Sequence, residues 1–390
     1  MRILMANDYS TGYGGAEDQL LALRNHLRER GHEVLTFSSD ARPGPGPTRA
    51  DVTCLGTTTG ARTLLQTANP SAARGLRRLL ASFRPDIVHL FVFLTQLSPL
   101  ILPVLRRIPT LYYAVWYRAV CPLGTKMLPD GSPCAVPWGV ACLRNRCVPP
   151  WDWVPLMAQM GMVHRWKGPL GVVANSEETR RQLERGGVGV LAVIGHGVRA
   201  APEPSVRAER PTIAFAGRIV AEKGLDTLVH ALARVAEVLP GVHLLVAGDG
   251  PERGAAERLV SELGLTGHVT FLGHREPPDL DRLLVPAWVH AVPSRWQEPF
   301  GMVAAEAMMR AAPVVASRCG GLQGLVLDGE TGLLVAPDDA AALADALLAL
   351  LCDAERAEAM GRAGQRVAEA RYTVQAQADA FLAVYRQLLD

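Results

Sequence analysis

Two glutamates stand eight positions apart in the run Glu298-Pro-Phe-Gly-Met-Val-Ala-Ala-Glu306. Upstream, Arg218 and Lys223 follow a predicted strand and lie five positions apart. Carboxylates accept hydrogen bonds from hydroxyl groups, whereas Arg and Lys bind phosphate oxygens. Gly301 opens the helix that we expect after the first glutamate, and the first amides of a helix can receive phosphate oxygens without any side chain. Such a set suits a ligand with both a diphosphate and hydroxyls, as in a nucleotide sugar.

Each of these four charged residues also has a purely structural interpretation. Arg218 and Lys223 could be a solvated surface residue and a residue at a helix start, and Glu298 and Glu306 could be a capping and a solvated helix residue. We favour the binding interpretation because the four occur together. In addition, Glu306 lies in an apolar stretch of its helix, residues 303–307.

The elements that position these residues alternate between strand and helix. We expect strands at 2–6, 34–37, 110–115, 170–174, 212–215, 242–247, 269–272, 288–292 and 314–317, and helices at 16–30, 224–238, 251–262, 277–284, 300–310 and 375–389. Such alternation is typical of parallel sheets covered by helices. Ligands of such sheets bind beyond the carboxyl ends of the strands.

The length and composition limit the classes of protein. A chain of 390 residues, 49% hydrophobic and 20% charged, predicts two globular domains. The net charge of +2 gives no support for nucleic acid as a partner. The first residues do not read as a secretory signal, so we expect a cytoplasmic protein. Residues 87–105 are apolar but contain His89, Gln96, Pro99 and Pro103, so we expect a buried strand and short helix rather than a membrane span.

Several motifs in chain order resemble the glycosyltransferases of the GT-B fold, and among them the retaining family four. They are Gly14-Gly-Ala-Glu17, Arg30-Gly-His-Glu-Val34, Phe215-Ala-Gly-Arg218, Glu222-Lys-Gly224, Gly248-Asp-Gly-Pro251, Pro293-Ser294, Glu298 to Met308, Pro313-Val-Val-Ala-Ser317, Gly320-Gly321 and Asp328-Gly-Glu-Thr-Gly332. The resemblance implies two facing, doubly wound Rossmann-like α/β domains with a cleft between them. An acceptor-binding domain would span 1–198, with a Cys- and Trp-rich insertion near 121–165. A linker at 199–210, a donor-binding domain at 211–372 and a C-terminal helix at 373–390, crossing back to the first domain, would follow.

The resemblance also implies roles for individual residues. Arg218 and Lys223 would hold the donor diphosphate, Glu298 the donor sugar and Glu306 the ribose. Gly14, Gly15 and the amides of Gly301, Met302 and Val303 would also bind the donor. Arg275 would bind it near the base. We take Arg218, Lys223 and Glu298 as the catalytic candidates. No cofactor or metal is then required, because the departing diphosphate is stabilised by Arg218 and Lys223 and takes the acceptor's proton.

Two positions depart from the family's pattern. Val115 or Trp116 stands where the family often has a histidine, and Gly324 stands where a glutamate commonly follows the Gly-Gly pair. These departures leave open a catalytically weak donor-binding partner of another transferase, and a nucleotide-sugar epimerase is a further alternative. The acceptor, a glycan, a lipid or a small molecule, is not specified by the sequence.

The insertion carries four of the seven cysteines, Cys121, Cys134, Cys142 and Cys147. Their spacing contains no Cys-x-x-Cys pair, so we expect free thiols, with a structural zinc site as the alternative. Four tryptophans lie nearby, at 138, 151, 153 and 166. They fit ordinary core, an acceptor platform or a peripheral contact with anionic lipid.

Overall fold

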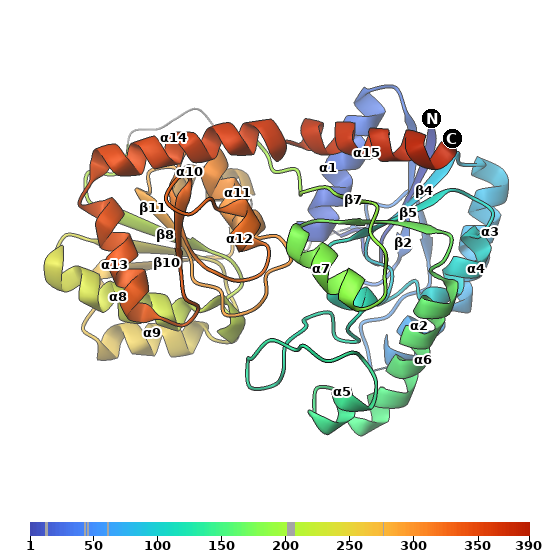
Figure 1. The fold of residues 1–390 in the computed structure, drawn as a ribbon, viewed down its shortest axis with the longest axis horizontal. Coiled ribbons are helices and arrows are strands. Elements are labelled where there is room, and N and C mark those ends of the chain that lie inside the picture. Colours follow the sequence, from blue (N-terminus) through green and yellow to red (C-terminus); the bar gives the residue numbers. More distant parts are fainter. Residues whose placement is uncertain (12–14, 43, 45–46, 61, 201–206, 276) are drawn as a thin grey trace. The chain divides into compact units, whose positions relative to one another are not determined.

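The chain forms two compact units, each with its own sheet (Figure 1). The computed structural model describes residues 1–390 except 12–14, 43, 45–46, 61, 201–206 and 276. The first unit comprises Met1–Gly197 and Val374–Asp390, and the second comprises Val198–Thr373. Part of the expected linker, 201–206, lies outside the described residues.

The described residues of the first unit form a seven-stranded parallel sheet in the order β3-β2-β1-β4-β5-β6-β7. The strands are β1 (Arg2–Ala6), β2 (Glu33–Ser39), β3 (Val52–Cys54), β4 (Ile87–Leu90), β5 (Thr110–Ala114), β6 (Leu170–Ala174) and β7 (Ala192–Val193). Successive side chains of a strand point to opposite faces. Leu4 and Ala6 therefore join one hydrophobic cluster, and Ile3 and Met5 join the other. Both faces are covered, which explains why these strands are apolar along their whole length.

Helices cover both faces of this sheet. On one face lie α1 (Gly15–Glu29) and α15 (Val374–Leu389), which contact each other and cross in the view of Figure 1. On the other lie α3 (Pro70–Phe83), α4 (Leu102–Leu105), α6 (Pro150–Trp166) and α7 (Glu177–Arg185). Two shorter helices, α2 (Arg62–Thr67) and α5 (Val140–Arg144), contact α6.

The C-terminal helix α15 is an integral part of the first unit. Phe381 and Tyr385 are fully buried there. The Tyr385 hydroxyl lies 2.6 Å from Nδ1 of His89 on β4. A buried polar pair of this kind fixes the helix in one position, because shifting it would leave both groups without partners.

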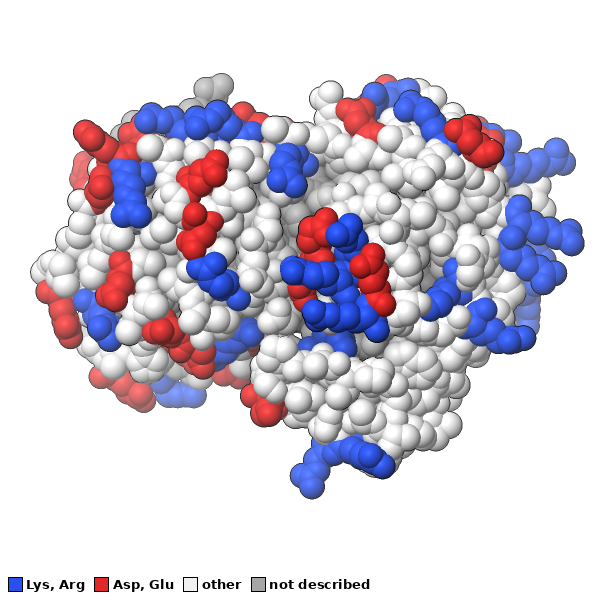
Figure 2. Space-filling model, in the orientation of Figure 1, with Lys and Arg blue, Asp and Glu red and all other residues white. Residues whose placement is uncertain are grey.

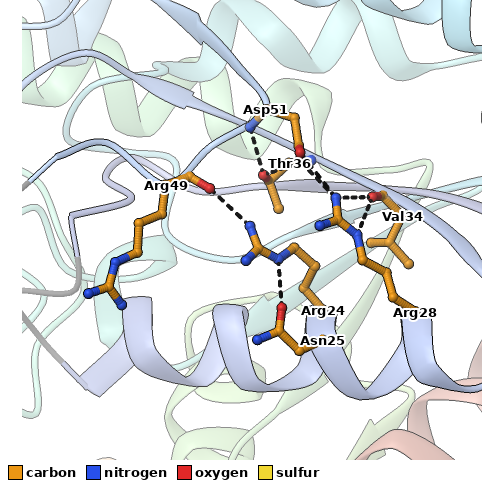
Figure 3. A network of polar contacts seen from close by, with 7 residues as sticks. All are labelled: Arg24, Asn25, Arg28, Val34, Thr36, Arg49 and Asp51. Atoms are coloured by element: carbon orange, nitrogen blue, oxygen red, sulfur yellow. Dashed lines mark hydrogen bonds and ion pairs between the residues drawn. The ribbon is translucent and has the colours of Figure 1, made fainter.

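A polar network ties α1 to the neighbouring strand β2 (Figure 3). Arg28 donates to the carbonyl of Val34 and to both carboxylate oxygens of Asp51, at 3.1 and 3.0 Å. The same carboxylate accepts from the amide and hydroxyl of Thr36, at 2.7 and 2.6 Å. Burial raises the pKa of Asp51, but the Thr36 hydrogen bonds and the Arg28 charge outweigh it, and the pKa lies below its ordinary value. The charged carboxylate thus anchors the first helix of the βαβ unit.

The described residues of the second unit form a six-stranded parallel sheet in the order β10-β9-β8-β11-β12-β13. Its strands are β8 (Thr212–Ala216), β9 (His243–Ala247), β10 (Val269–Gly273), β11 (Val289–Val292), β12 (Val314–Ser317) and β13 (Gly332–Val335). Around it lie α8 (Leu225–Val238), α9 (Arg253–Glu262), α10 (Pro277–Leu284), α11 (Met302–Met309), α12 (Leu322–Leu325), α13 (Ala340–Leu351) and α14 (Ala354–Arg371). The doubly wound α/β class that the sequence predicts is confirmed for both units.

No helix in the described part of the chain combines the length and the hydropathy needed to cross a membrane. The apolar stretch at 87–105 instead contains β4 and α4, which are separated by a loop and a short 3-10 helix, Pro99–Ile101.

Close packing of two strand-end loops in the second unit requires a glycine. Gly248 follows β9 with φ at 137°, and a Cβ there would lie 1.8 Å from the carbonyl oxygen of Gly217, which follows β8. Gly267, in contrast, has open space around its Cβ position.

We therefore expect Gly248→Ala to lower the free energy of unfolding by about 2–4 kcal/mol, because backbone strain and overpacking add. Gly267→Ala is the matched control and should stay within about 0.5 kcal/mol of the parent chain. Urea denaturation measures both. Equal stability of the two variants would contradict the close approach of the loops.

Candidate functional site

The candidate site lies at the carboxyl ends of β8 and β11 in the second unit. These two strands are neighbours, and the chain leaves them toward opposite edges of the sheet, to β9 and to β12. Loops that diverge at such a reversal of strand order form the usual ligand position of a doubly wound sheet. The loop after β8 carries Arg218 and Lys223, and the loop after β11 carries Glu298 and Gly301.

Lys223 and Glu298 meet directly. Nζ of Lys223 lies 2.5 Å from Oε1 of Glu298, although the two residues are 75 positions apart in the chain. The hydroxyl of Ser294 donates to the same oxygen at 2.7 Å. Glu298 is buried and Lys223 half-buried, so this ion pair is screened less by water than a surface pair would be. The pair joins the two loops across the boundary between β8 and β11.

The surroundings keep Glu298 charged. Burial raises the pKa of its carboxyl, but the charge of Lys223 and the hydrogen bonds from Lys223 and Ser294 lower it by more. The pKa of Glu298 therefore lies below its ordinary value of 4.5. At neutral pH the carboxylate is an acceptor only, and the ammonium of Lys223 has three donors, of which Glu298 uses one. The pair can thus still donate to an anion and accept from a hydroxyl.

Arg295, which was not among the residues predicted from the sequence, holds the same two loops together. Its backbone amide donates to the carbonyl of Glu222 at 2.8 Å. Its guanidinium donates to Asp226 and Asp338, both at 2.7 Å, and to Thr227 at 2.8 Å. Asp226 and Thr227 belong to α8, which begins two residues after Lys223. In the sequence, the signal for this role was an Arg directly after Ser294 together with carboxylates near the other loop. Its acidic partners, Asp226 and Asp338, are far from Arg295 in the sequence.

Two glycines let a third loop approach Glu298. Gly320, after β12, has φ at 53°, and a Cβ there would lie 2.2 Å from the carbonyl oxygen of Glu298. The amide of Gly321 donates to that same oxygen at 2.6 Å. Cys319 is buried beside them, and its thiol contacts the Ser294 carbonyl at 3.3 Å. Burial raises the pKa of Cys319 to about 12, so it remains a neutral thiol. The Gly320-Gly321 pair therefore allows the loop after β12 to pack against the loop that carries Glu298.

Helix α11 begins directly after this loop. Gly301 is its N-cap in a left-handed conformation, with φ at 99°. Met302 and Val303 form its first turn and are half-buried, as is Glu306 one turn later. Helix starts favour anions because their amides are unpaired and the helix dipole is positive there. The residues whose amides we predict to bind phosphate, Gly301, Met302 and Val303, thus lie at the start of the helix that follows the Glu298 loop.

The other residues that we predict to bind the donor substrate are exposed or lie outside the described residues. Arg218 and Arg275 are exposed at the ends of β8 and β10. Within the described residues, the guanidinium of Arg218 forms no hydrogen bond or ion pair, so it is available to a ligand. Gly15 is the first residue of α1 in the first unit and is exposed. Gly14 lies outside the described residues.

The first unit has its own buried carboxylate at the equivalent reversal of strand order. Asp8 follows β1 and accepts from the amides of Thr95, Gln96 and Leu97, at 2.7–2.8 Å, and from the Thr95 hydroxyl at 2.6 Å. Burial raises the pKa of Asp8, and these four hydrogen bonds partly offset the shift. Asp8 thus fixes the loop after β4. Asp8 was not among the residues predicted from the sequence, although polar Asn7 and Asp8 directly after a strand were a signal for it.

The four cysteines of the insertion are free thiols and all half-buried. Among the described residues, no group of three or more His, Cys, Asp or Glu side chains is arranged to hold a metal ion. Val115 directly follows β5 and is half-buried. Gly324 lies in α12, where an added Cβ meets nothing within 4 Å, so the fold leaves room there for a larger side chain.

The chain also matches known protein families and solved structures. Residues 200–367 match the family model "Glycosyl transferases group 1", and residues 14–149 match "Glycosyl transferase 4-like domain". A D-inositol 3-phosphate glycosyltransferase of Mycobacterium bovis is 41% identical over 184 residues, 45% of this chain and 37% of that protein. The alignment thus spans less than half the length of this curated relative.

Two solved structures share the fold over the whole chain. Sucrose-phosphate synthase of Thermosynechococcus elongatus superimposes with a TM-score of 0.74 at 24% identity, covering 100% of this chain and 99% of that one. HepE of Anabaena, in complex with UDP, superimposes with a TM-score of 0.72 at 21% identity, covering 99% and 100%. On the two family models and this fold, the chain belongs to the GT-B glycosyltransferases of the family-four kind.

Proposed function

We propose that the chain is a retaining glycosyltransferase, which moves a sugar from a nucleoside-diphosphate sugar to an acceptor hydroxyl. The observation that carries the proposal is the ion pair of Lys223 and Glu298 beside the start of α11. The ion pair offers a cation and a charged acceptor, and the start of α11 beside it offers helix-start amides. A sugar diphosphate needs these three kinds of group together.

Each group of the donor has a matching residue. Lys223 and Arg218 bind the diphosphate, with the amides of 301–303 completing its cradle. Glu298 accepts hydrogen bonds from hydroxyls of the sugar, since its carboxylate has lone pairs beyond those used by Lys223 and Ser294. Glu306, further along α11, accepts from the ribose. Gly15 adds an amide from the first unit, and Arg275 lies near the base.

The chemistry that we propose is transfer on one face of the sugar. The bond between the anomeric carbon and the diphosphate oxygen breaks, and the acceptor oxygen bonds to the same face of that carbon. The acceptor's proton passes to the departing phosphate oxygen. Lys223 and Arg218 stabilise the negative charge that develops on the diphosphate, which is the usual largest contribution to such a reaction. Positioning of the two substrates supplies much of the remainder.

Uridine diphosphate sugars are our first choice of donor. The HepE structures were solved with UDP and with UDP-glucose, and they share this chain's fold. The acceptor, a glycan, a lipid-linked sugar or a small molecule, is to be found by experiment. A metal ion is not part of the proposed chemistry, because two cationic side chains serve the diphosphate.

A panel of UDP-, GDP-, ADP- and dTDP-sugars tests this function. We expect one donor to raise the melting temperature of the chain, because a ligand that binds the folded state stabilises it. Lys223→Met and Arg218→Ala should each lower the rate of transfer or donor hydrolysis about 100-fold, as expected for loss of one charge-stabilising group. Arg234→Met, an exposed residue of α8, is the control.

Three outcomes would contradict the proposal. They are no stabilisation by any nucleotide sugar, near-normal turnover in Lys223→Met and Arg218→Ala, and conversion of the donor to an epimer without an acceptor.

We also propose that Arg295 is a positioning residue for Lys223. It touches no predicted ligand group, but it links the loop that carries Glu298 to the start of α8 next to Lys223. Its guanidinium has five donors in a fixed planar fork, whereas a lysine ammonium is a compact charge with three donors, so a lysine at this position would lose some of these hydrogen bonds.

Arg295→Lys should therefore raise KM for the donor about tenfold, with little change in melting temperature, because one or two poorly replaced hydrogen bonds cost about 1.4 kcal/mol. Steady-state kinetics with a varied donor measures this. Arg362→Lys, which alters an exposed ion pair on α14, is the matched control. A loss of stability without a change in KM would show a merely structural role for Arg295.

A further inference from the structure

The excess of basic over acidic residues in this chain lies in one part of the first unit, where Asp and Glu are scarce. Residues 52–176 contain 13 Lys and Arg but only three Asp and Glu, whereas the whole chain contains 40 and 38. The near-neutral total therefore hides a strongly basic region. Figure 2 shows Lys and Arg side chains, without Asp or Glu, over α3 and α4.

A groove of about 1060 Å³ concentrates this charge between α3 and α4. We call it the arginine groove and define it by Arg74, Arg77, Arg106 and Arg107. All four are exposed, and within the described part of the chain none of them is ion-paired. Its other lining residues are mostly apolar, among them Leu80, Leu100, Pro103 and Val104. Unpaired guanidinium groups over an apolar floor suit a ligand with phosphates and hydrocarbon.

Exposed apolar side chains lie in the same layer of helices. Trp151 and Val154 are 77% and 64% exposed and stand three residues apart on α6, hence on one face of that helix. Leu64, on α2, is 69% exposed. We call these three residues the apolar edge. Helix α6 contacts both α2 and α4, so the groove and the edge belong to one contiguous layer.

We propose that the outer face of this layer docks on an anionic membrane surface. The arginine groove receives lipid phosphates, and the apolar edge enters the interface between headgroups and acyl chains. Tryptophan favours this depth in a bilayer, and basic residues are attracted by the negative surface potential. A soluble polyanion would use the arginines alone, so the apolar edge argues for a bilayer. The surface lies outside the donor site, so a failed donor assay would leave this proposal standing.

Sedimentation with lipid vesicles tests the proposal on the full chain. We expect binding to vesicles of 30% phosphatidylglycerol in phosphatidylcholine at low salt, and much weaker binding to pure phosphatidylcholine. Arg106→Ala with Arg107→Ala should lower the partition coefficient about 25-fold, at about fivefold for each arginine. Arg234→Ala with Arg258→Ala, two exposed arginines of the second unit, is the matched control and should bind like the parent chain.

A second variant separates a membrane from a soluble polyanion. Trp151→Ala with Val154→Ala should bind several-fold more weakly and lose all of its remaining binding in 0.5 M salt, because only charge attraction is left. Circular dichroism checks that the variants fold. The proposal fails if the parent chain does not bind anionic vesicles. It also fails if the groove variant binds like the parent chain, or if the edge variant is unchanged.

Discussion

The ion pair of Lys223 and Glu298 is the interaction on which the candidate site depends. A glutamate as buried as Glu298 stays charged only when a cation and hydrogen bonds compensate for lost water. Lys223 supplies the cation from a loop 75 positions earlier in the chain. The pair therefore requires that the loops after β8 and β11 meet, and the parallel order of the sheet brings them together. Arg295 and the close approach of Gly320 hold the glutamate loop in that position.

The two units compensate a buried carboxylate with different kinds of partner. Each sheet reverses its strand order next to its first strand, and each places a buried carboxylate there, Asp8 in the first unit and Glu298 in the second. The Asp8 carboxylate accepts hydrogen bonds from three backbone amides and a hydroxyl, and these donors are fixed in position by the loop that carries them. Glu298 is satisfied by a flexible lysine that retains unused donors. Only the second arrangement is suited to receive an anionic ligand, since Lys223 can bind it without leaving Glu298 uncompensated.

The sequence was sufficient for the fold class, and it indicated that Lys223 and Glu298 lie in strand-end loops of the second unit, while their roles in donor binding stay predictions. Apolar runs and glycine-ended helices located the strands, and the spacing around Glu298 indicated its loop and helix. It was not sufficient for the contact of Glu298 with Lys223, which depends on the tertiary arrangement of two loops. Arg295 was missed for the same reason, because Asp226 and Asp338 are remote from it in sequence. The basic character of residues 52–176 was hidden by the near-zero total charge.

The pKa of Glu298, measured by carboxyl NMR titration, tests the central ion pair most directly. We predict a value below 4.5 in the parent chain, so that the stability it contributes is present above about pH 4.5 and is lost as the pH falls through the folded-state pKa. In Lys223→Met the charge is gone and burial remains, so the pKa should rise above 4.5. Arg218→Ala should leave it unchanged. A pKa of Glu298 that is the same with and without Lys223 would contradict the account.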